Sequence, residues 1–339
     1  MTDPAALFRA SRARRIATAA MFGGGGLGLL TAAGWGLLYG EAKLARRWVG
    51  TPDGQPPQAD GIWGAGGGLP IRLAVLGDSS AAGLGVDDAM ATPAVLLAAG
   101  LSEVAGRPVR LFNVAVVGAR SSDLVGQVDR VAPERPDIAM IMIGINDVTG
   151  RVRPADSVRE LSAGVTRLRE IGCEGVVGTC PDLGTVKPVL QPLRHLARMW
   201  CRQLAAAQTI AVVEAGGRTV SLGDILGPEF DARPEELFSP DRFHPSAEGY
   251  AAAAAVVLPS VCAALGIWPE EDLPPLPFHR DGVRPVARAA ARAAGHAGTE
   301  VTGAQVGGQE HGRRGRWAFL RRRRPRPVPE AADVPHHAV

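Results

Sequence analysis

Cysteine is scarce in this 339-residue chain, which holds four. No metal-ligand spacing links them. Cys173 and Cys180 fall at opposite ends of one predicted strand, about 23 Å apart along extended chain, well beyond the roughly 7 Å limit of a disulfide. Cys201 and Cys262 fall in helix-like stretches, where they are interpreted as small buried hydrophobic residues. The cysteines therefore predict no metal site of their own, and they leave the redox compartment open.

A phosphate-binding loop is also missing, because the glycine runs at 23–26 and 66–68 are not followed by Gly-Lys-Ser/Thr. Basic charge is missing from the middle of the chain. Residues 70–269 carry a net charge of −4, whereas residues 1–50 carry +5 and residues 270–339 carry +4. A nucleic-acid-binding domain would more often show a basic face within its folded part. We therefore expect no nucleic-acid partner.

Charged residues are absent from 16–40, and this run is flanked by four arginines in residues 1–15 and by three basic residues in 41–47. The run is long enough to cross a bilayer, so it predicts a single-pass membrane anchor over 16–40 after a basic segment over 1–15. A cleaved signal peptide, which would have a shorter apolar region, and a soluble apolar helix are the alternatives. The one-charge excess before the run favours an internal N-terminus, with the rest of the chain outside the cytoplasm.

Composition divides the remaining chain into three parts. Residues 41–69 are rich in Pro and Gly, which predicts a linker. Residues 70–268 are numerous enough for one well-buried domain. Residues 269–339 are rich in Pro, Ala, Gly and Arg and poor in large apolar residues, which predicts a disordered basic tail. Its Arg321–Arg324 cluster indicates either a solubilising segment or a weak contact with anionic lipid.

Apolar runs alternate with helical patterns through the middle domain. We expect strands at Ile71–Leu76, Val109–Val114, Ile138–Ile143, Gly175–Thr179 and Thr209–Val213, and helices around 91–105, 121–132, 156–171, 191–208 and after Pro245, with Ser246 as the last N-cap. Strands this apolar, separated by helices, predict a parallel sheet covered on both faces. Ligands in such sheets bind at the carboxyl ends of the strands.

Three motifs lie at these strand ends or in nearby loops: Gly77-Asp78-Ser79, Gly144-Ile145-Asn146-Asp147 and Asp241-Arg242-Phe243-His244. The hydroxyl of Ser79 becomes a good nucleophile only when a base removes its proton. His244 is a candidate for that base, with Asp241 orienting its ring. The side chain of Asn146 and the backbone N–H of Gly118 could donate hydrogen bonds to a developing oxyanion. Each motif alone is more typical of an ordinary turn, but the ordered set predicts ester hydrolysis.

The order Ser, Gly, Asn, His, each at a strand end, resembles the SGNH family of serine hydrolases, also called GDSL hydrolases. The resemblance covers the middle domain and implies a three-layer α/β/α fold with a flavodoxin-like parallel sheet of five strands. It implies that Ser79 is the nucleophile, His244 the base and Asp241 its orienting carboxylate. It also implies an oxyanion hole formed by the N–H groups of Ser79 and Gly118 and the side chain of Asn146. The first motif reads Asp-Ser-Ser rather than Asp-Ser-Leu, a position at which family members vary.

These observations predict a membrane-anchored serine esterase that cleaves carboxylic esters through an acyl-Ser79 intermediate, without a metal or organic cofactor. The expected substrates are small-molecule, lipid or glycan esters, and in the envelope these would be lipids or acylated glycans. The loops over Pro181–Pro192 and Leu222–Pro240 predict a partly apolar acyl pocket. Two alternatives remain open, namely an acyltransferase that uses the same site and a non-catalytic binding module of the same fold.

Overall fold

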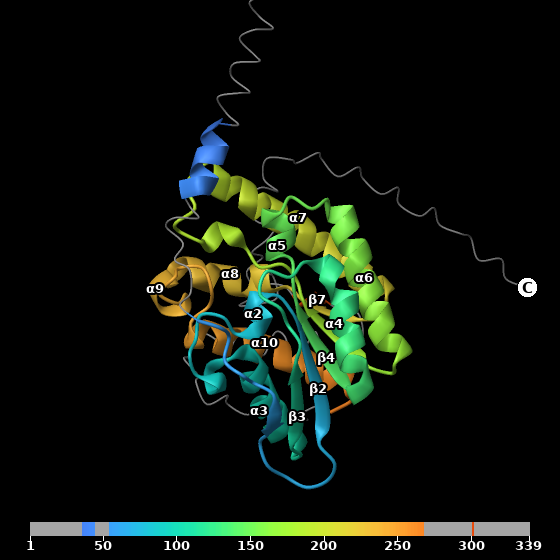
Figure 1. The fold of residues 1–339 in the computed structure, drawn as a ribbon. Helices are drawn as coiled ribbons and strands as arrows, with labels where there is room; N and C mark the ends of the chain where they lie inside the picture. The colour runs from blue at the N-terminus through green and yellow to red at the C-terminus, as the bar shows by residue number, and fades with distance from the viewer. Residues whose placement is uncertain (1–35, 45–53, 268–299, 302–339) are drawn as a thin grey trace, which may run out of the picture.

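A central sheet flanked by helices forms the body of the protein (Figure 1). The computed structural model describes residues 36–44, 54–267 and 300–301. The predicted basic segment 1–15, most of the predicted anchor and the Arg321–Arg324 cluster lie outside the described residues.

The sheet has seven strands in the order β1-β3-β2-β4-β5-β6-β7. Their bounds are β1 Gly61–Trp63, β2 Ile71–Gly77, β3 Val109–Asn113, β4 Ile138–Met142, β5 Glu174–Gly178, β6 Arg218–Val220 and β7 Glu300–Val301. All neighbouring pairs are parallel except β1 and β3. The five strands β3-β2-β4-β5-β6 follow the flavodoxin-like order. The predicted α/β fold class is therefore confirmed.

Two short edge strands extend the sheet beyond the five that the sequence predicts. β1 comes from the predicted linker 41–69 and pairs antiparallel with β3, so the ordered domain begins before residue 70. β7 comes from the predicted tail and pairs with β6. Each has three residues or fewer, which is too little periodicity to be recognised in the sequence.

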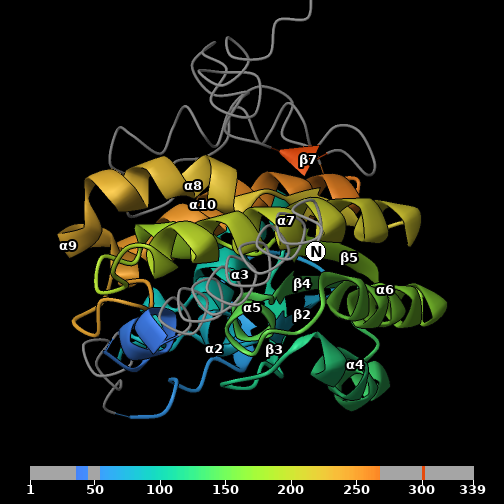
Figure 2. The same cartoon turned by 90° about the horizontal axis from the view of Figure 1, so that it is seen from above.

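Helices cover both faces of the sheet, because successive strand residues point to opposite sides. Leu73 and Val75 of β2 pack into the apolar cluster beneath one helical layer, and Ala74 and Leu76 pack into the cluster beneath the other. The first layer contains α3 (Pro93–Ala105), α8 (Leu222–Ala232) and α10 (Ala247–Ala264), and the second contains α4 (Leu124–Val131), α6 (Pro154–Glu170) and α7 (Leu193–Glu214). Figure 2 looks down on these layers. The fold thus has the three-layer arrangement that the sequence predicts.

The predicted strand at Thr209–Val213 is wrong, because α7 continues through it and the strand β6 begins at Arg218. The buried residues of α7 are Ala197, Cys201, Leu204, Gln208 and Val212, which recur at helical spacing. The neighbouring Ile210 and Val213 lie on the exposed face of this helix. A short apolar run cannot be assigned to a strand or a helix by its own periodicity, which explains the error.

Two helical segments bear on the membrane prediction. Residues 36–44 are helical, and the buried carboxylate of Glu41 accepts a hydrogen bond from the backbone N–H of Leu193 at 2.9 Å, at the start of α7. Among the described residues, α10 is the one helix long and apolar enough to cross a bilayer. Most of α10 is buried against α3 and the sheet, so it is a core helix of the domain.

Candidate active site

The turn that carries Ser79 is fixed by the two residues before it, through the backbone of Gly77 and the side chain of Asp78. Gly77 ends β2 with φ of +133°, and a Cβ there would lie 1.9 Å from the carbonyl oxygen of Met142, so only glycine fits. Asp78 caps the short helix α2 (Ser79–Ala82) by accepting a hydrogen bond from the N–H of Ser80 at 2.9 Å. Ser79 therefore begins a helix directly at the carboxyl end of a central strand.

Two buried glutamine amides hold the strand ends at this edge. Gln127 of α4 accepts a hydrogen bond from the N–H of Gly77 at 2.7 Å and donates one to its carbonyl oxygen at 2.9 Å. Gln208 of α7 accepts from the N–H of Cys180 at 2.7 Å and donates to the carbonyl oxygen of Ile143 at 3.0 Å. Backbone groups that pass beyond the regular strand pairing are thereby satisfied inside the protein.

A tight turn before α10 carries the last motif. Arg242 adopts φ of +60°, a left-handed conformation that residues other than glycine rarely adopt. In this turn Oδ1 of Asp241 accepts hydrogen bonds from the N–H groups of Phe243 and His244 at 2.8 and 2.9 Å. The hydroxyl of Ser239 donates a third at 2.7 Å. Three hydrogen bonds to Oδ1 thus fix the orientation of the Asp241 carboxylate and leave Oδ2 for the imidazole.

The fold brings Ser79, His244 and Asp241 into one chain of hydrogen bonds. Nδ1 of His244 lies 2.6 Å from Oδ2 of Asp241, and its Nε2 lies 3.0 Å from Oγ of Ser79. All three side chains are buried, although 165 residues separate the serine from the histidine. This is the geometry in which an oriented imidazole can take a proton from a serine hydroxyl.

The ionisation of Asp241 fixes how the imidazole is oriented. Burial raises the pKa of its carboxyl, but the hydrogen bonds from His244, Ser239 and the two backbone N–H groups outweigh that effect and hold it at about 2. Because the carboxylate has no proton to give at neutral pH, Nδ1 of His244 must donate. In the neutral ring Nε2 is then the acceptor that faces Ser79.

Asp78, which directly precedes Ser79, has the opposite shift. Burial raises the pKa of its carboxyl to about 7, against the lowering effects of the hydrogen bond from the Ser80 N–H and of nearby His244. This carboxyl is therefore partly protonated near neutral pH.

The two other predicted oxyanion donors lie in the loop after β3 and in a short helix after β4, and a hydrogen bond joins the two segments. Gly118 follows β3 in an exposed loop with φ of +83°. Asn146 lies in α5 (Ile145–Thr149), just after β4, and its Nδ2 donates to the carbonyl oxygen of Ala119 at 3.0 Å. A side-chain amide has two N–H donors, so this bond leaves one for a ligand. Both segments lie at the carboxyl edge of the sheet, as does Ser79.

A second contact joins the same two segments. The buried carboxyl of Asp147 accepts hydrogen bonds from the N–H and the hydroxyl of Ser121, both at 3.1 Å. Burial raises the pKa of the Asp147 carboxyl, and the hydrogen bonds from Ser121 oppose that shift. Asp147 therefore positions the loop of Gly118 against the turn of Asn146.

An apolar pocket of about 100 Å³, here called the inner pocket, adjoins these residues. Its lining includes the sequence neighbours of the site residues, namely Ser80, Ile145, Phe243 and Pro245. Much of its apolar wall comes from α8 and from the segment 181–186. These belong to the two loop regions that the sequence predicts to shape an acyl pocket.

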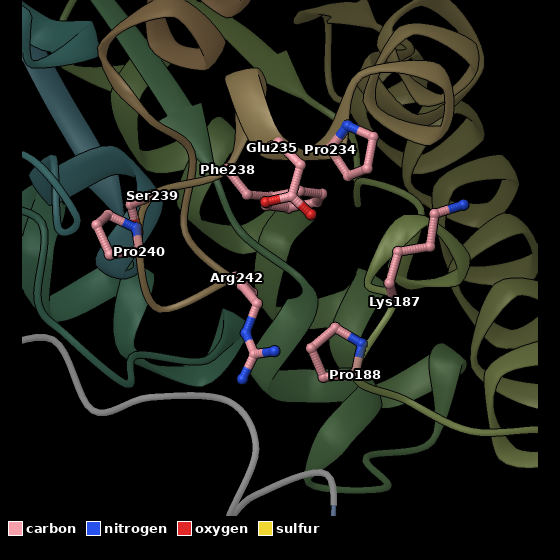
Figure 3. A pocket seen from close by; sticks show the side chains of 8 residues that line it. All are labelled: Lys187, Pro188, Pro234, Glu235, Phe238, Ser239, Pro240 and Arg242. Carbon is pink, nitrogen blue, oxygen red and sulfur yellow. The ribbon is translucent and has the colours of Figure 1, made fainter.

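A larger pocket of about 260 Å³, here called the outer pocket, lies beside the inner one (Figure 3). It is lined by Lys187, Pro188, Pro234, Glu235, Phe238, Ser239, Pro240 and Arg242. Phe238 lines both pockets and packs edge-to-face on Phe230 with ring centroids 4.9 Å apart. The two pockets are therefore neighbours across one aromatic side chain.

In the part of the chain that the structure describes, no group of three or more His, Cys, Asp or Glu side chains is placed so that it could bind a metal ion. The four cysteines are free and buried. Burial raises the pKa of Cys173 and of Cys262 to about 12, so their thiols stay protonated at neutral pH.

Sequence reasoning missed several residues that hold the site. Ser239 donates to Asp241 from two residues away, a spacing typical of a local turn, so the signal was present but weak. Gln127 and Gln208 act on strand ends 50 and 65 residues away, and nothing local in the sequence identifies them. Residues of this kind can be found only when the topology is known.

Comparisons with known proteins place the chain in a family. A model described as the GDSL-like lipase/acylhydrolase family matches residues 75–252, a span that includes all three motifs. The GDSL-like esterase Rv1075c of Mycobacterium tuberculosis is 43% identical over 261 residues, which cover 74% of this chain and 82% of that protein.

Solved structures of lower identity are also similar. LAE5, an α/β hydrolase enzyme from the metagenome of Lake Arreo, is 22% identical, with coverage of 61% of this chain and 99% of that one and a TM-score of 0.44. Axe2, an acetylxylan esterase from Geobacillus stearothermophilus, is 19% identical, with coverage of 60% and 95% and a TM-score of 0.43. On the family match and the 43% identical relative, the resemblance drawn from the motifs is confirmed, and this chain belongs to the GDSL-like lipase/acylhydrolase family.

Proposed function

We propose that this protein is a carboxylic ester hydrolase that acts through an acyl-Ser79 intermediate. The observation that carries the proposal is the continuous hydrogen-bond chain from Ser79 through His244 to Asp241, at 3.0 and 2.6 Å. Family membership and the name of the 43% identical relative, an esterase, support the same activity.

The reaction follows from the orientation of the imidazole. Nε2 of His244 takes the proton of Ser79 as Oγ attacks the ester carbonyl carbon, and the C–O bond to the alcohol breaks as that proton passes to the leaving alkoxide. Water then attacks the acyl group and gives its proton to Nε2, and Ser79 Oγ departs with that proton as the acid is released. Asp241 stabilises the imidazolium formed in both halves of the reaction.

Charge on the carbonyl oxygen develops during both attacks. Ser79 is the first residue of α2, so its backbone N–H has no partner within that helix. We assign this N–H, the N–H of Gly118 and the second amide hydrogen of Asn146 to the oxyanion. Preorganised donors of this kind are each worth about 3–4 kcal/mol of transition-state stabilisation.

The inner pocket is the proposed acyl site. Its apolar wall suits a hydrocarbon chain, and it borders the neighbours of Ser79, Asn146 and His244. Its volume of about 100 Å³ is smaller than the engineered cavity of about 150 Å³ that holds benzene. We therefore propose that the enzyme prefers esters of short acyl groups.

Labelling with a fluorophosphonate probe tests the nucleophile. Ser79→Ala is expected to abolish both labelling and the hydrolysis of p-nitrophenyl acetate, because it removes the attacking oxygen. Ser102→Ala is the matched control, since Ser102 is a buried serine of α3 that hydrogen-bonds Ala65 away from the site. Labelling that persists in Ser79→Ala would contradict the proposal.

We also propose that the enzyme is bound to the cell membrane, with its catalytic domain outside the cytoplasm. The uncharged run 16–40 and its basic flanks support this, and Glu41 ties the end of that run to α7. Carbonate washing is expected to leave the protein in the membrane fraction, and protease added to intact spheroplasts is expected to digest it. Full protection of the domain beside a digested external control would place it on the cytoplasmic side.

A further inference from the structure

The outer pocket has mixed chemistry that the hydrolytic step does not use. Figure 3 shows the carboxylate of Glu235 directed into it, with Pro188 across from it and Arg242 along one side, whereas the ammonium of Lys187 points away from the other labelled side chains. Phe238 and the proline rings supply apolar walls. The pocket therefore offers a hydrogen-bond acceptor, donors and apolar surface within one space of about 260 Å³.

The outer pocket is connected to the active site through one loop. The segment 238–245 supplies Phe238, Ser239 and Arg242 to the outer pocket, and Phe243 and Pro245 to the inner pocket. A second segment also contributes to both pockets, because Val186 lines the inner pocket and the next residue, Lys187, lines the outer one. A ligand that spans both pockets would pass the turn that carries Asp241 and His244.

Glu235 and Arg242 line the outer pocket with opposite charges, so the lining has no excess charge of one sign that would favour an ionic ligand. Lys187 is paired with Asp231, so its charge is compensated within the protein. The exposed carboxylate of Glu235 would repel an anion in the pocket. A neutral group with several hydroxyls avoids that repulsion, since each hydroxyl can donate to Glu235 or accept from a neighbouring cation.

We propose that the outer pocket binds the alcohol portion of the ester, and that this portion is a neutral polyhydroxylated group such as glycerol or a sugar residue. The inference rests on the proposed esterase function and narrows it. The substrate is then an ester with a short apolar acyl group in the inner pocket and a hydroxyl-bearing alcohol in the outer one.

Two acetate esters that differ in the alcohol test the proposal on the full-length protein. The alcohol portion of glyceryl monoacetate carries free hydroxyls, whereas that of ethyl acetate carries none. Glu235→Ala is expected to raise KM for glyceryl monoacetate by about tenfold, the value of a hydrogen bond to a charged group, with kcat little changed. Hydrolysis of ethyl acetate is expected to stay within about twofold of wild type.

Glu236→Ala is the matched control. Glu236 is exposed in the same first turn of α9 (Pro234–Leu237), but it pairs with Arg233 and does not line the pocket. It is expected to leave both esters unaffected. Glu235→Gln keeps the shape of the side chain, removes its charge and is expected to give a smaller rise in KM for the glyceryl ester.

The outcomes separate this inference from the proposed function. If Glu235→Ala leaves KM for glyceryl monoacetate unchanged, or slows both esters alike, the outer-pocket assignment is overturned while the esterase function stands. If the wild-type protein hydrolyses neither these esters nor p-nitrophenyl acetate, the proposed function fails, and this inference fails with it.

Discussion

Two buried carboxyls lie close to His244, and the protein treats them in opposite ways. Asp241 and Asp78 are exposed by 7% and 3% respectively, so both lose most of their hydration. The pKa of Asp241 is nevertheless held at about 2, whereas burial raises that of Asp78 to about 7. Burial alone therefore does not decide whether a carboxyl at this site is charged.

The difference lies in the deeper burial of Asp78 and in the donors that each turn supplies. Asp241 meets the hydroxyl of Ser239, two backbone N–H groups and the imidazole. Among the described residues, the carboxyl of Asp78 accepts a single hydrogen bond, from the N–H of Ser80. Hydrogen bonds to the charged form offset desolvation when there are several of them, but a single one does not. The last turn thus keeps a permanent anion beside the proposed base, and the first turn keeps a carboxyl that titrates.

Asp241→Asn is expected to have the largest effect on activity, because it removes the charge that distinguishes Asp241 from Asp78. The amide is nearly the same size but carries no charge, so it can neither stabilise an imidazolium nor hold Nδ1–H as the donor. We expect kcat for p-nitrophenyl acetate to fall by about a thousandfold or more. Asp137→Asn is the control, because the pKa of that carboxyl is also lowered, with Arg72 donating to it, yet it lies away from the site. A harmless Asp241→Asn would remove the orienting role.

Asp78→Asn tests the titrating partner. The folded pKa of about 7 exceeds the unfolded value of about 3.9, so the unfolded state releases its proton first as pH rises. Wild-type stability is therefore expected to fall between about pH 4 and pH 7, by up to about 4 kcal/mol. The variant should lack this loss and be the more stable protein at pH 7, with little difference at pH 4.

Urea unfolding at several pH values measures this effect. Asp88→Asn is the matched control, because Asp88 caps a short helix through the same kind of bond, from the N–H of Met90 at 2.9 Å, but is exposed. It should show no such pH-dependent gain. A constant stability difference between Asp78→Asn and wild type from pH 4 to pH 7 would show that Asp78 is not held protonated.

Ser239→Ala tests how much one hydrogen-bond donor contributes to the difference between Asp241 and Asp78, and it is expected to have the smallest effect. It removes one donor from Asp241 and leaves the others, so the pKa of this carboxyl should rise and its hold on the imidazole should weaken. We expect kcat to fall by about five- to tenfold, which corresponds to one hydrogen bond. Kinetics on p-nitrophenyl acetate measure it, with Ser102→Ala as the control. An unchanged kcat would mean that the backbone donors alone define the Asp241 turn.

The parts of the molecule that the sequence predicted correctly are those with a local signal. β2, β3, β4 and β5 are apolar runs of five to seven residues, and each lies within a residue or so of its predicted bounds. Ser246 caps α10 through the N–H of Gly249, as expected from its place after Pro245. Ser79, Asp241 and His244 could be named as candidates because each lies in a short motif, Ser79 at the end of β2 and the other two in the turn before α10.

The parts that escaped prediction depend on distant contacts. The apolar run at Thr209–Val213 suits a strand as well as one face of a long helix, and only packing distinguishes the two. Glu235 lies in the short proline-initiated helix α9 and Phe238 directly follows it, and neither belongs to a recognisable motif. Their importance appears only when the loop that carries them meets Lys187 and Pro188 across a pocket.

The buried amides of Gln127 and Gln208 take the place of strand pairing at the carboxyl edge of the sheet. A primary amide presents one donor and one acceptor side by side, as the edge of a peptide unit does. Each glutamine therefore serves as a one-residue substitute for a neighbouring strand at the carboxyl edge of the sheet. Because neither amide ionises, these hydrogen bonds do not depend on whether the nearby carboxyl of Asp78, with its pKa of about 7, carries a proton.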